Sequence, residues 1–169
     1  LEGRGATGIR VSTDEAERLR FWAGRKAAFP AAGRISADYY CMDGTIPRKR
    51  LGDMLQAIAG MERKYGLRCI NVFHAGDGNL HPLILYDANV PGELERTEMF
   101  GAEILELSVK FGGTVTGEHG VGFEKLPGMC AQFDSAELAA FHRVKAAFDP
   151  AGLLNPGKAV PTLHRCAEL

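Results

Sequence analysis

The chain has 169 residues, which suits one domain that buries roughly 70% of its unfolded surface and is too short for two ordinary domains. Its 20 basic and 21 acidic side chains nearly cancel, so charge does not indicate nucleic acid or an anionic membrane as a partner. No apolar run approaches the roughly 20 residues of a membrane helix, and no signal-peptide pattern is present. The composition therefore favours a cytoplasmic protein that binds small molecules or other proteins.

The N-terminal residues differ from the rest of the chain. The sequence begins with Leu1 rather than Met, and residues 1–8 are rich in glycine and lack periodicity. We expect a piece of a longer polypeptide, in which residues 1–11 are disordered or extraneous and residues 12–169 form one domain. No C-x-x-C spacing is present, so reduced thiols are expected at Cys41, Cys69, Cys130 and Cys166.

Four segments have the spacing of amphipathic helices. Ser12 and Glu15 have capping-box spacing, which predicts a first helix over residues 13–29. Pro47 begins the most regular stripe, which ends at Gly66. A third helix is expected from Pro91 to the Gly112-Gly113 pair. The last helix is capped by Asp134 or Ser135, and its apolar residues are expected to face inward at Leu138, Phe141, Val144 and Phe148.

Short strand-like runs alternate with the middle helices. They cover residues 37–42, 67–74, 80–87 and 114–116. The order from residue 37 to 117 is therefore β-α-β-β-α-β, which usually folds as an antiparallel sheet with helices on one face. We predict an α+β fold with this ferredoxin-like core and additional N- and C-terminal helices. A fold of this kind does not establish a function, so the function has to be argued from the site.

Two histidines lie on either side of the predicted hairpin turn. Asp77-Gly78 can supply the positive φ angles of a type I′ turn. With these two residues at the tip, His74 faces His81 across the ladder, with Cβ atoms roughly 4.5 to 5.5 Å apart. The two imidazoles could then bind one metal ion. A cross-strand histidine pair is by itself more often a structural or surface feature, and this alternative stays open.

A glycine-rich loop, Gly117-Glu118-His119-Gly120-Val121-Gly122, offers further functional groups. A catalytic ion usually takes a third protein ligand, and Glu118 is the carboxylate that the motifs favour. The set His74, His81 and Glu118 suits zinc, with manganese and iron also open. His119 is a candidate acid-base group, because imidazole titrates near neutral pH. An ordinary loop that happens to contain both residues is the alternative.

The simplest form of the predicted sheet places these groups apart. The strand that ends at Glu118 would run parallel to the strand that starts at His81, so Glu118 would lie at the far end from the hairpin tip. At about 3.3 Å per residue, the gap could exceed 10 Å. Either the strand arrangement differs or the loop folds back over the sheet.

Three motifs together resemble a known set. They are HAGDGNLHP at residues 74–82, GEHGVG at residues 117–122 and FDPAGLLNPGK at residues 148–158. In this order they resemble the C-terminal domain of FAD-linked oxidases of the vanillyl-alcohol-oxidase superfamily, and within it the branch of the bacterial glycolate oxidase FAD subunits. The resemblance extends from about Trp22 to the C-terminus.

The resemblance implies oxidation of a 2-hydroxy acid to a 2-oxo acid, with a hydride passing to FAD. It implies a divalent metal on His74, His81 and Glu118, with His119 as the base. Electrons would continue to an iron-sulfur or other acceptor subunit. Relatives that take larger acids tend to have a basic residue near Cys41 and a polar one near Leu83, so a small acid such as glycolate or D-lactate is expected here.

Three more residues receive roles from the resemblance. Arg25 matches the position that clamps the substrate carboxylate, for which a guanidinium is well shaped. Its alternative is a solvated helix residue. Asn155 and Lys158 lie in the motif that approaches the flavin, although Asn-Pro-Gly-Lys also forms ordinary turns. His142 and His164 are assigned to structure or surface.

The FAD-binding domain, which normally precedes this region in the family, is not in the sequence. Residues 12–169 would therefore be the substrate-side cap domain, with FAD bound mostly by the missing domain and little activity in isolation. The implied location is the cytoplasm, with contact to the inner face of the membrane through partner subunits. Two other classes stay open, namely a non-catalytic metal- or ligand-binding α+β module and a subunit-docking domain.

Overall fold

The fold is that of a computed structural model of the chain, in which residues 3, 5–162 and 166 are described. The chain divides into two compact units, Leu1–Ile35 and Ser36–Leu169. Among the described residues, no helix has both the length and the apolar character needed to cross a bilayer. His164 lies outside the described residues.

The first unit contains the helices α1 (Glu15–Lys26) and α2 (Ala28–Ala32). The N-cap of α1 is Asp14, whose carboxylate accepts a hydrogen bond from the Glu17 N–H at 2.7 Å. The predicted cap at Ser12 is therefore wrong by two residues. Asp14 and Glu17 have the same capping spacing, and the extended backbone of Asp14 is the conformation that a cap requires.

The second unit begins with two short strands, and its helices and strands then follow the predicted order. The Gly66 residue that ends the most regular predicted stripe has a φ angle of 67°, which is the usual left-handed end of a helix. The elements are β1 (Asp38–Cys41), β2 (Gly44–Thr45), a 3-10 helix (Arg48–Arg50), α3 (Leu51–Tyr65), β3 (Arg68–His74), β4 (Asn79–Tyr86), α4 (Glu93–Lys110), α5 (Leu126–Gln132) and α6 (Ser135–Phe148).

The sheet is organised around β4. Strand β3 pairs with one edge of β4, while β1 and β2 pair with the other, and every pairing is antiparallel. The predicted α+β class is confirmed. The strand predicted at residues 114–116 is reduced to one antiparallel bridge between Thr114 and Thr45. The strand predicted at residues 37–42 is observed as β1, and β2, which was not predicted, follows after the chain leaves the ladder between Cys41 and Gly44.

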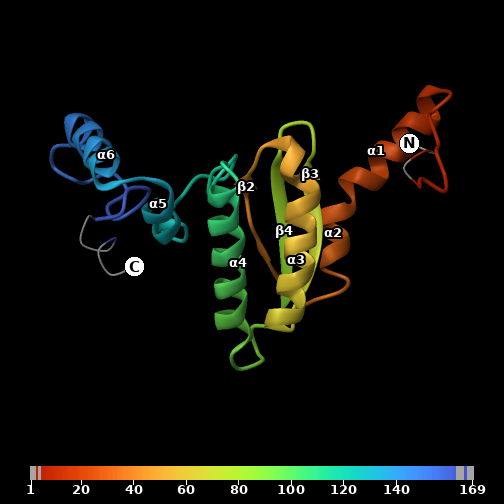
Figure 1. Ribbon diagram of the computed structural model, residues 1–169, viewed down its shortest axis with the longest axis horizontal. Coiled ribbons are helices and arrows are strands. Elements are labelled where there is room, and N and C mark those ends of the chain that lie inside the picture. The colour runs from red at the N-terminus through yellow and green to blue at the C-terminus, as the bar shows by residue number, and fades with distance from the viewer. Residues whose placement is uncertain (1–2, 4, 163–165, 167–169) are drawn as a thin grey trace. The chain divides into compact units, whose positions relative to one another are not determined.

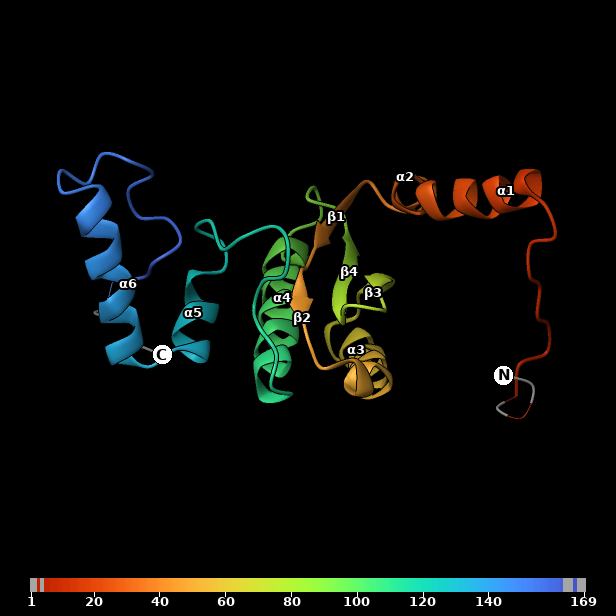
Figure 2. The same cartoon turned by 90° about the horizontal axis from the view of Figure 1, so that it is seen from above.

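Helices α3 and α4 cover one face of this sheet (Figure 1, Figure 2). Their buried residues pack with alternate residues of β4, and this core includes Met54, Ile58, Phe100, Ile104, Leu80 and Ile84. The predicted inward stripe of α3 is confirmed at Met54, Ile58 and Met61. Because side chains alternate along a strand, the β4 residues between Leu80 and Ile84 that lie at odd numbers point to the opposite face.

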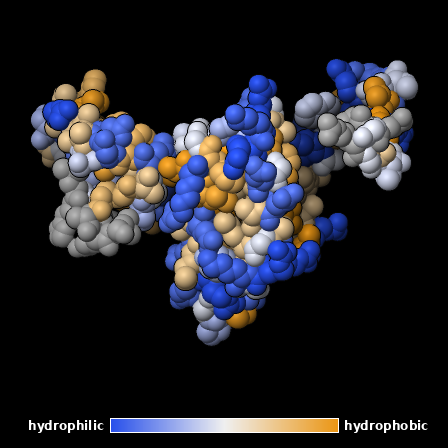
Figure 3. All heavy atoms as spheres, in the orientation of Figure 1, coloured by the Kyte–Doolittle hydropathy of each residue, from blue (hydrophilic) through white to orange (hydrophobic). Residues whose placement is uncertain are grey.

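The C-terminal region was predicted only in part. Helix α5 was not predicted, whereas the capping of α6 by Asp134 is confirmed by its reciprocal bonds with Glu137. Val144 and Phe148 were expected inside, but 59% and 84% of their surfaces are exposed. Only the first part of the stripe, Leu138 and Phe141, packs against the core. The second part, Val144 and Phe148, lies beyond these core contacts. Figure 3 shows apolar spheres at the surface among hydrophilic ones.

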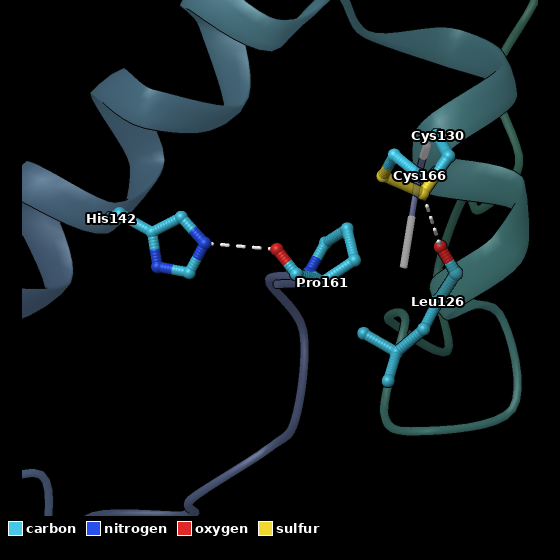
Figure 4. Close-up of a disulfide and its surroundings, with 5 residues drawn as sticks. All are labelled: Leu126, Cys130, His142, Pro161 and Cys166. Carbon is cyan, nitrogen blue, oxygen red and sulfur yellow. Dashed lines mark hydrogen bonds between the residues drawn. A yellow bond between two sulfur atoms is a disulfide. The ribbon is translucent and has the colours of Figure 1, made fainter. Parts of the chain in front are cut away.

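A disulfide joins Cys130 of α5 to Cys166 near the C-terminus (Figure 4). The expectation of reduced thiols is wrong for this pair and holds for Cys41 and Cys69, which are free. Sequence spacing could not reveal the pair, because the two cysteines are 36 residues apart. Beside it, His142 Nε2 donates to the Pro161 carbonyl at 2.8 Å, which agrees with the structural role predicted for this histidine.

Candidate metal centre

The hairpin brings the two predicted histidines to the same face of the sheet. Its register pairs His74 with Asn79 and Val72 with His81, so the turn covers residues 75–78. The predicted direct pairing of His74 with His81 is therefore wrong by two residues. A shift of two preserves the face, because side chains alternate with a period of two. The histidines lie diagonally, with ring centroids 5.3 Å apart and planes at 87°.

The carboxylate of Glu118 lies between the two imidazoles. One of its oxygens is 3.4 Å from His74 Nε2, and the other is 3.5 Å from His81 Nε2. Bonds of about 2.0–2.2 Å to one tetrahedral ion place two ligand atoms roughly 3 to 3.5 Å apart. The spacing and chemistry of these three side chains therefore fit a divalent cation.

His81 is held in the orientation that such a ligand needs. Its side chain is almost fully buried, and Nδ1 lies 3.3 Å from the Met42 carbonyl. A hydrogen bond from Nδ1–H to that carbonyl leaves the lone pair on Nε2, which is the nitrogen that faces Glu118. His74 and Glu118 are more open, with 39% and 54% of their side chains exposed. The cluster thus has one buried anchor and an accessible side.

The loop that bears Glu118 and His119 is fixed by one carboxylate, that of Asp43. Asp43 lies between β1 and β2 and is completely buried. Its side chain accepts hydrogen bonds from the backbone N–H groups of Gly117 at 3.0 Å, Glu118 at 3.1 Å and His119 at 2.8 Å. The Thr116 hydroxyl donates to it as well, at 2.8 Å. A single side chain therefore sets the path of the backbone through the loop.

Asp43 is ionised in this environment. Burial by itself would raise its pKa, but the hydrogen bonds from His119, Thr116, Glu118 and Gly117 outweigh burial and hold the pKa well below its usual range. The ammonium of Lys125, itself buried, lies 3.3 Å from the same carboxylate. The negative charge is thus neutralised inside the protein and remains available as an acceptor for the loop.

The predicted gap between Glu118 and the hairpin does not exist. Thr114 bridges Thr45, which also pairs with Asn79, so the segment after Thr114 starts level with the hairpin tip. It then passes close to the strands at Gly117, where an added Cβ would lie 2.5 Å from Thr45 Oγ1 and 2.8 Å from the Asn79 side chain. Glycine at this position allows the approach that brings Glu118 to His81.

His119 and Cys41 complete the surroundings of His81. The His119 ring is stacked on the His81 ring, with centroids 5.0 Å apart and planes at 12°. Cys41 ends β1 opposite Leu83, which is two residues from His81 on the same face of β4. Burial raises the pKa of the Cys41 thiol to about 11, with Asp43 adding to the effect and Lys125 opposing it. The group is therefore a neutral thiol at pH 7.

The remaining predicted residues are Arg25, Asn155 and Lys158. Arg25 is an exposed residue of α1, in the first unit. Asn155 and Lys158 are exposed and close one turn, in which the Lys158 N–H donates to the Asn155 carbonyl at 3.3 Å. The residue after this turn, Ala159, donates to the Gly122 carbonyl at 2.7 Å. The third motif is thereby connected to the glycine-rich loop.

The sequence analysis missed Asp43 and Lys125. Asp43 is 75 residues away from Glu118, to which it is hydrogen bonded, and no periodicity or motif connects two positions so far apart. One signal was available: an aspartate within an otherwise apolar and glycine-containing segment, Cys41-Met42-Asp43-Gly44, is expected to be buried only if its carboxylate is paired.

Comparison with known proteins identifies relatives along the whole chain. The chain is 67% identical over 164 residues to the glycolate oxidase subunit GlcD of Escherichia coli K12, covering 97% of this chain and 33% of that protein. It is 38% identical over 153 residues to the Bacillus subtilis protein of the same name, covering 90% and 33%. Identity to a probable mitochondrial D-lactate dehydrogenase of Danio rerio is 32% over 161 residues, covering 91% and 31%. The chain thus spans about a third of the length of these relatives.

A family model gives the same answer as the individual relatives. Residues 1–159 match the model described as FAD linked oxidases, C-terminal domain. The match includes the hairpin, the Asp43 segment and the glycine-rich loop. The predicted family is confirmed: the chain belongs to the FAD linked oxidases, as their C-terminal domain.

Proposed function

We propose that the chain forms the substrate side of an FAD-dependent oxidoreductase that converts a small 2-hydroxy acid, of the glycolate or D-lactate type, to the 2-oxo acid. The observation that carries this proposal is the position of the Glu118 carboxylate between His74 Nε2 and His81 Nε2. The relatives support the substrate class, because glycolate and D-lactate are both 2-hydroxy acids. We assign this activity to a polypeptide of the length of these relatives, of which the chain covers about a third.

His74, His81 and Glu118 would hold a divalent cation, with zinc, manganese and iron all compatible with two imidazoles and a carboxylate. When bound, the ion would polarise a substrate hydroxyl and lower its pKa. The accessible side of the cluster, at His74 and Glu118, leaves room for the hydroxyl and carboxylate oxygens of a small acid. The buried His81 ring keeps the ligand set in place.

His119 is the proposed base. Its ring stacks on that of the proposed ligand His81, so an imidazole nitrogen would be close enough to accept a proton from a substrate hydroxyl held at the metal. Arg25 is proposed to clamp the substrate carboxylate through its planar guanidinium. With the proton held by His119, the hydride on the adjacent carbon would pass to FAD.

Further parts of the complete enzyme are proposed on the same basis. Asn155 and Lys158 would approach the flavin, and most of the FAD would be bound by a separate domain of the polypeptide. The word subunit in the names of the glycolate oxidase relatives supports an additional partner protein, which would accept the electrons. We propose an iron-sulfur or other acceptor subunit, and a cytoplasmic location that places it near the inner face of the membrane.

The metal site is tested by elemental analysis of the purified chain. We expect about one zinc, manganese or iron per chain in the wild type. After loading with manganese, we expect little in His74→Ala and His81→Ala, because each variant removes one of three ligands. His142→Ala is the matched control, since this histidine contacts Pro161 rather than the cluster. Equal metal content in all four proteins would contradict the ligand assignment.

The activity is tested in a complete flavoprotein, in which this chain replaces the C-terminal third of the Escherichia coli relative. Oxidation of glycolate and D-lactate by an artificial electron acceptor is measured for the wild type and for His119→Ala. Removing a general base is expected to lower kcat about 10²- to 10⁴-fold while the metal content is unchanged. Full metal content without oxidation of either acid would leave a metal-binding module and overturn the proposed reaction.

A further inference from the structure

A second set of ligand atoms lies beside the first and shares one residue with it. Cys41, His81 and His119 each offer a sulfur or nitrogen atom, and these three atoms lie within 4.8 Å of one another. The first set, His74, His81 and Glu118, satisfies the same limit. His81 is thus the common member of two groups that differ in their other ligands, a carboxylate and an imidazole in one and a thiol and an imidazole in the other.

The two sets differ in the cations they favour. Carboxylate oxygen suits hard cations such as manganese, whereas thiolate sulfur selects soft ones such as zinc and cadmium. Cys41 is only half-buried and His119 is exposed, so an ion can reach both ligand atoms. We propose that Cys41, His81 and His119 form a soft-donor site for a thiophilic divalent cation, zinc or cadmium, as an alternative to the first site.

Local geometry supports the use of Cys41 as a ligand beside His81. The Cys41 sulfur and His81 Nδ1 are both in contact with the Met42 carbonyl, at 3.4 Å and 3.3 Å. One backbone oxygen thus lies beside both side chains, and the nitrogen that would bind the cation is Nε2, since Nδ1–H is hydrogen bonded to that oxygen. On binding, the cation forms a bond to the Cys41 sulfur, the S–H bond breaks, and the proton passes to solvent. The charge balances: the cation brings two positive charges, the released proton carries one away, and the site keeps one.

Occupation of the two sites is mutually exclusive. A neutral imidazole has one lone-pair nitrogen, so His81 binds one ion at a time. A thiophilic cation on Cys41 therefore takes His81 away from His74 and Glu118. It also takes the lone pair of His119, which is the base in the proposed function, so the inhibitory consequence rests on that function. The coordination itself does not depend on it.

The site is tested with cobalt(II), because a cobalt–thiolate bond gives a charge-transfer absorption that imidazole and carboxylate ligands lack. The chain is titrated with cobalt without thiol reductants, so that the disulfide stays closed. We expect the band in wild type and in His74→Ala and Glu118→Gln, which impair only the first site. It is lost in Cys41→Ser, Cys41→Ala and His119→Ala. Cys69→Ser, which changes the other free thiol, is the matched control and keeps the band.

Cadmium affinity gives a second readout on the same proteins. Loss of a ligand is expected to weaken cadmium binding at least about tenfold in Cys41→Ser, since even the partners of ligands contribute about 10- to 100-fold. X-ray absorption of cadmium-loaded His74→Ala should show one sulfur neighbour. No sulfur neighbour there, no thiolate band in wild type, or a band that persists in Cys41→Ser overturns the site.

The inhibitory consequence is measured separately in the complete flavoprotein. Cadmium is expected to inhibit the wild type, and Cys41→Ser should need at least about tenfold more cadmium for the same fractional loss of its own rate. Equal sensitivity of the two proteins contradicts inhibition through Cys41. A thiolate band in a flavoprotein that oxidises no 2-hydroxy acid would refute the proposed function while the soft-donor site stands.

Discussion

At the scale of single residues, Asp43 determines where the functional groups of the loop lie. It binds the backbone of Gly117, Glu118 and His119 rather than their side chains. The imidazole and carboxylate therefore stay available for ligands. The same aspartate lies 3.8 Å from His81 Nδ1, so it also adds negative charge beside the buried ligand. Its effect on chemistry is indirect, through position and charge.

Replacing Asp43 is expected to affect stability and metal binding together. Asp43→Ala leaves the buried ammonium of Lys125 without its carboxylate, which typically costs about 3–5 kcal/mol of unfolding free energy. It also releases the loop, so metal affinity should fall about 10- to 100-fold. Chemical denaturation and a competition titration with a metal chelator measure the two effects.

The double variant Asp43→Asn with Lys125→Met separates these two effects. It removes both buried charges, so most of the unfolding free energy should return. The asparagine NH2 cannot accept hydrogen bonds from the loop N–H groups, so the metal affinity stays low. Asp53→Ala, at an exposed position of α3, is the control and should change stability by no more than about 0.5 kcal/mol. Unchanged metal affinity in Asp43→Ala would show that the loop does not need this anchor.

At the scale of elements, α6 and the motif after it are joined by Asp149. This buried residue follows α6, and its carboxylate accepts hydrogen bonds from the N–H groups of Leu153 and Leu154, both at 2.9 Å. Lys145, one turn earlier, donates to the same carboxylate. The hydrogen bonds from Lys145 and Leu154 lower the pKa of Asp149, burial raises it, and the bond from Leu153 lowers it further, so the net shift is downward.

The lowered pKa of Asp149 predicts a pH dependence of stability. The folded pKa lies below the unfolded value of about 3.9, so the contribution is complete above that value and is lost as pH falls through the folded pKa. Wild type should therefore lose more unfolding free energy than Asp149→Asn between about pH 6 and pH 3. Denaturation curves at both pH values check this. Glu95→Gln, at an exposed carboxylate of α4, should behave like wild type, and parallel losses in wild type and Asp149→Asn would refute the assignment.

The sequence predicted those elements whose signal is local. The stripe of α3 and the capping of α6 follow from spacing within one helix, and the common face of His74 and His81 follows from strand alternation. The register was off by two because Gly76, Asp77 and Gly78 allow several turns, and only the tertiary contacts select one. Gly78 shows this: its φ is 77°, and an added Cβ would clash with the Ile46 carbonyl.

The position of Glu118 could not be derived in the same way. It depends on the pairing of Thr45 with both Asn79 and Thr114, and on the Asp43 carboxylate. These contacts connect segments that are far apart in the chain. The motif resemblance placed Glu118 in the site, but only the structure gives the physical cause, since the segment after α4 begins level with the hairpin tip.

At the scale of the whole molecule, the chain matches one part of longer relatives. It corresponds to about a third of its relatives, and several large apolar side chains after the cluster are exposed. Phe148, Leu153 and Leu154 have 84%, 78% and 61% of their surfaces accessible. They belong to the third motif, which is proposed to approach the flavin.

The role of Arg25 is a question at this scale, because it lies in the first unit and the metal ligands lie in the second. In the complete flavoprotein, Arg25→Ala is expected to raise KM for the 2-hydroxy acid about 10- to 100-fold, the loss of a charged hydrogen-bonded contact, with metal content unchanged. Steady-state kinetics over a range of acid concentrations measure this. Arg18→Ala, on the same helix and paired with Glu15, is the control. An unchanged KM would make Arg25 a solvated helix residue.

The buried Asp43 anchor also has a thermodynamic consequence. Since protein groups alone hold the loop against the hairpin, the ligands of the candidate centre are already gathered before any ion arrives. Little conformational entropy then has to be lost on binding, in contrast to small zinc domains that fold only around their metal. We therefore expect this domain to fold without its metal ion, so that the ion binds ligands that are already in position.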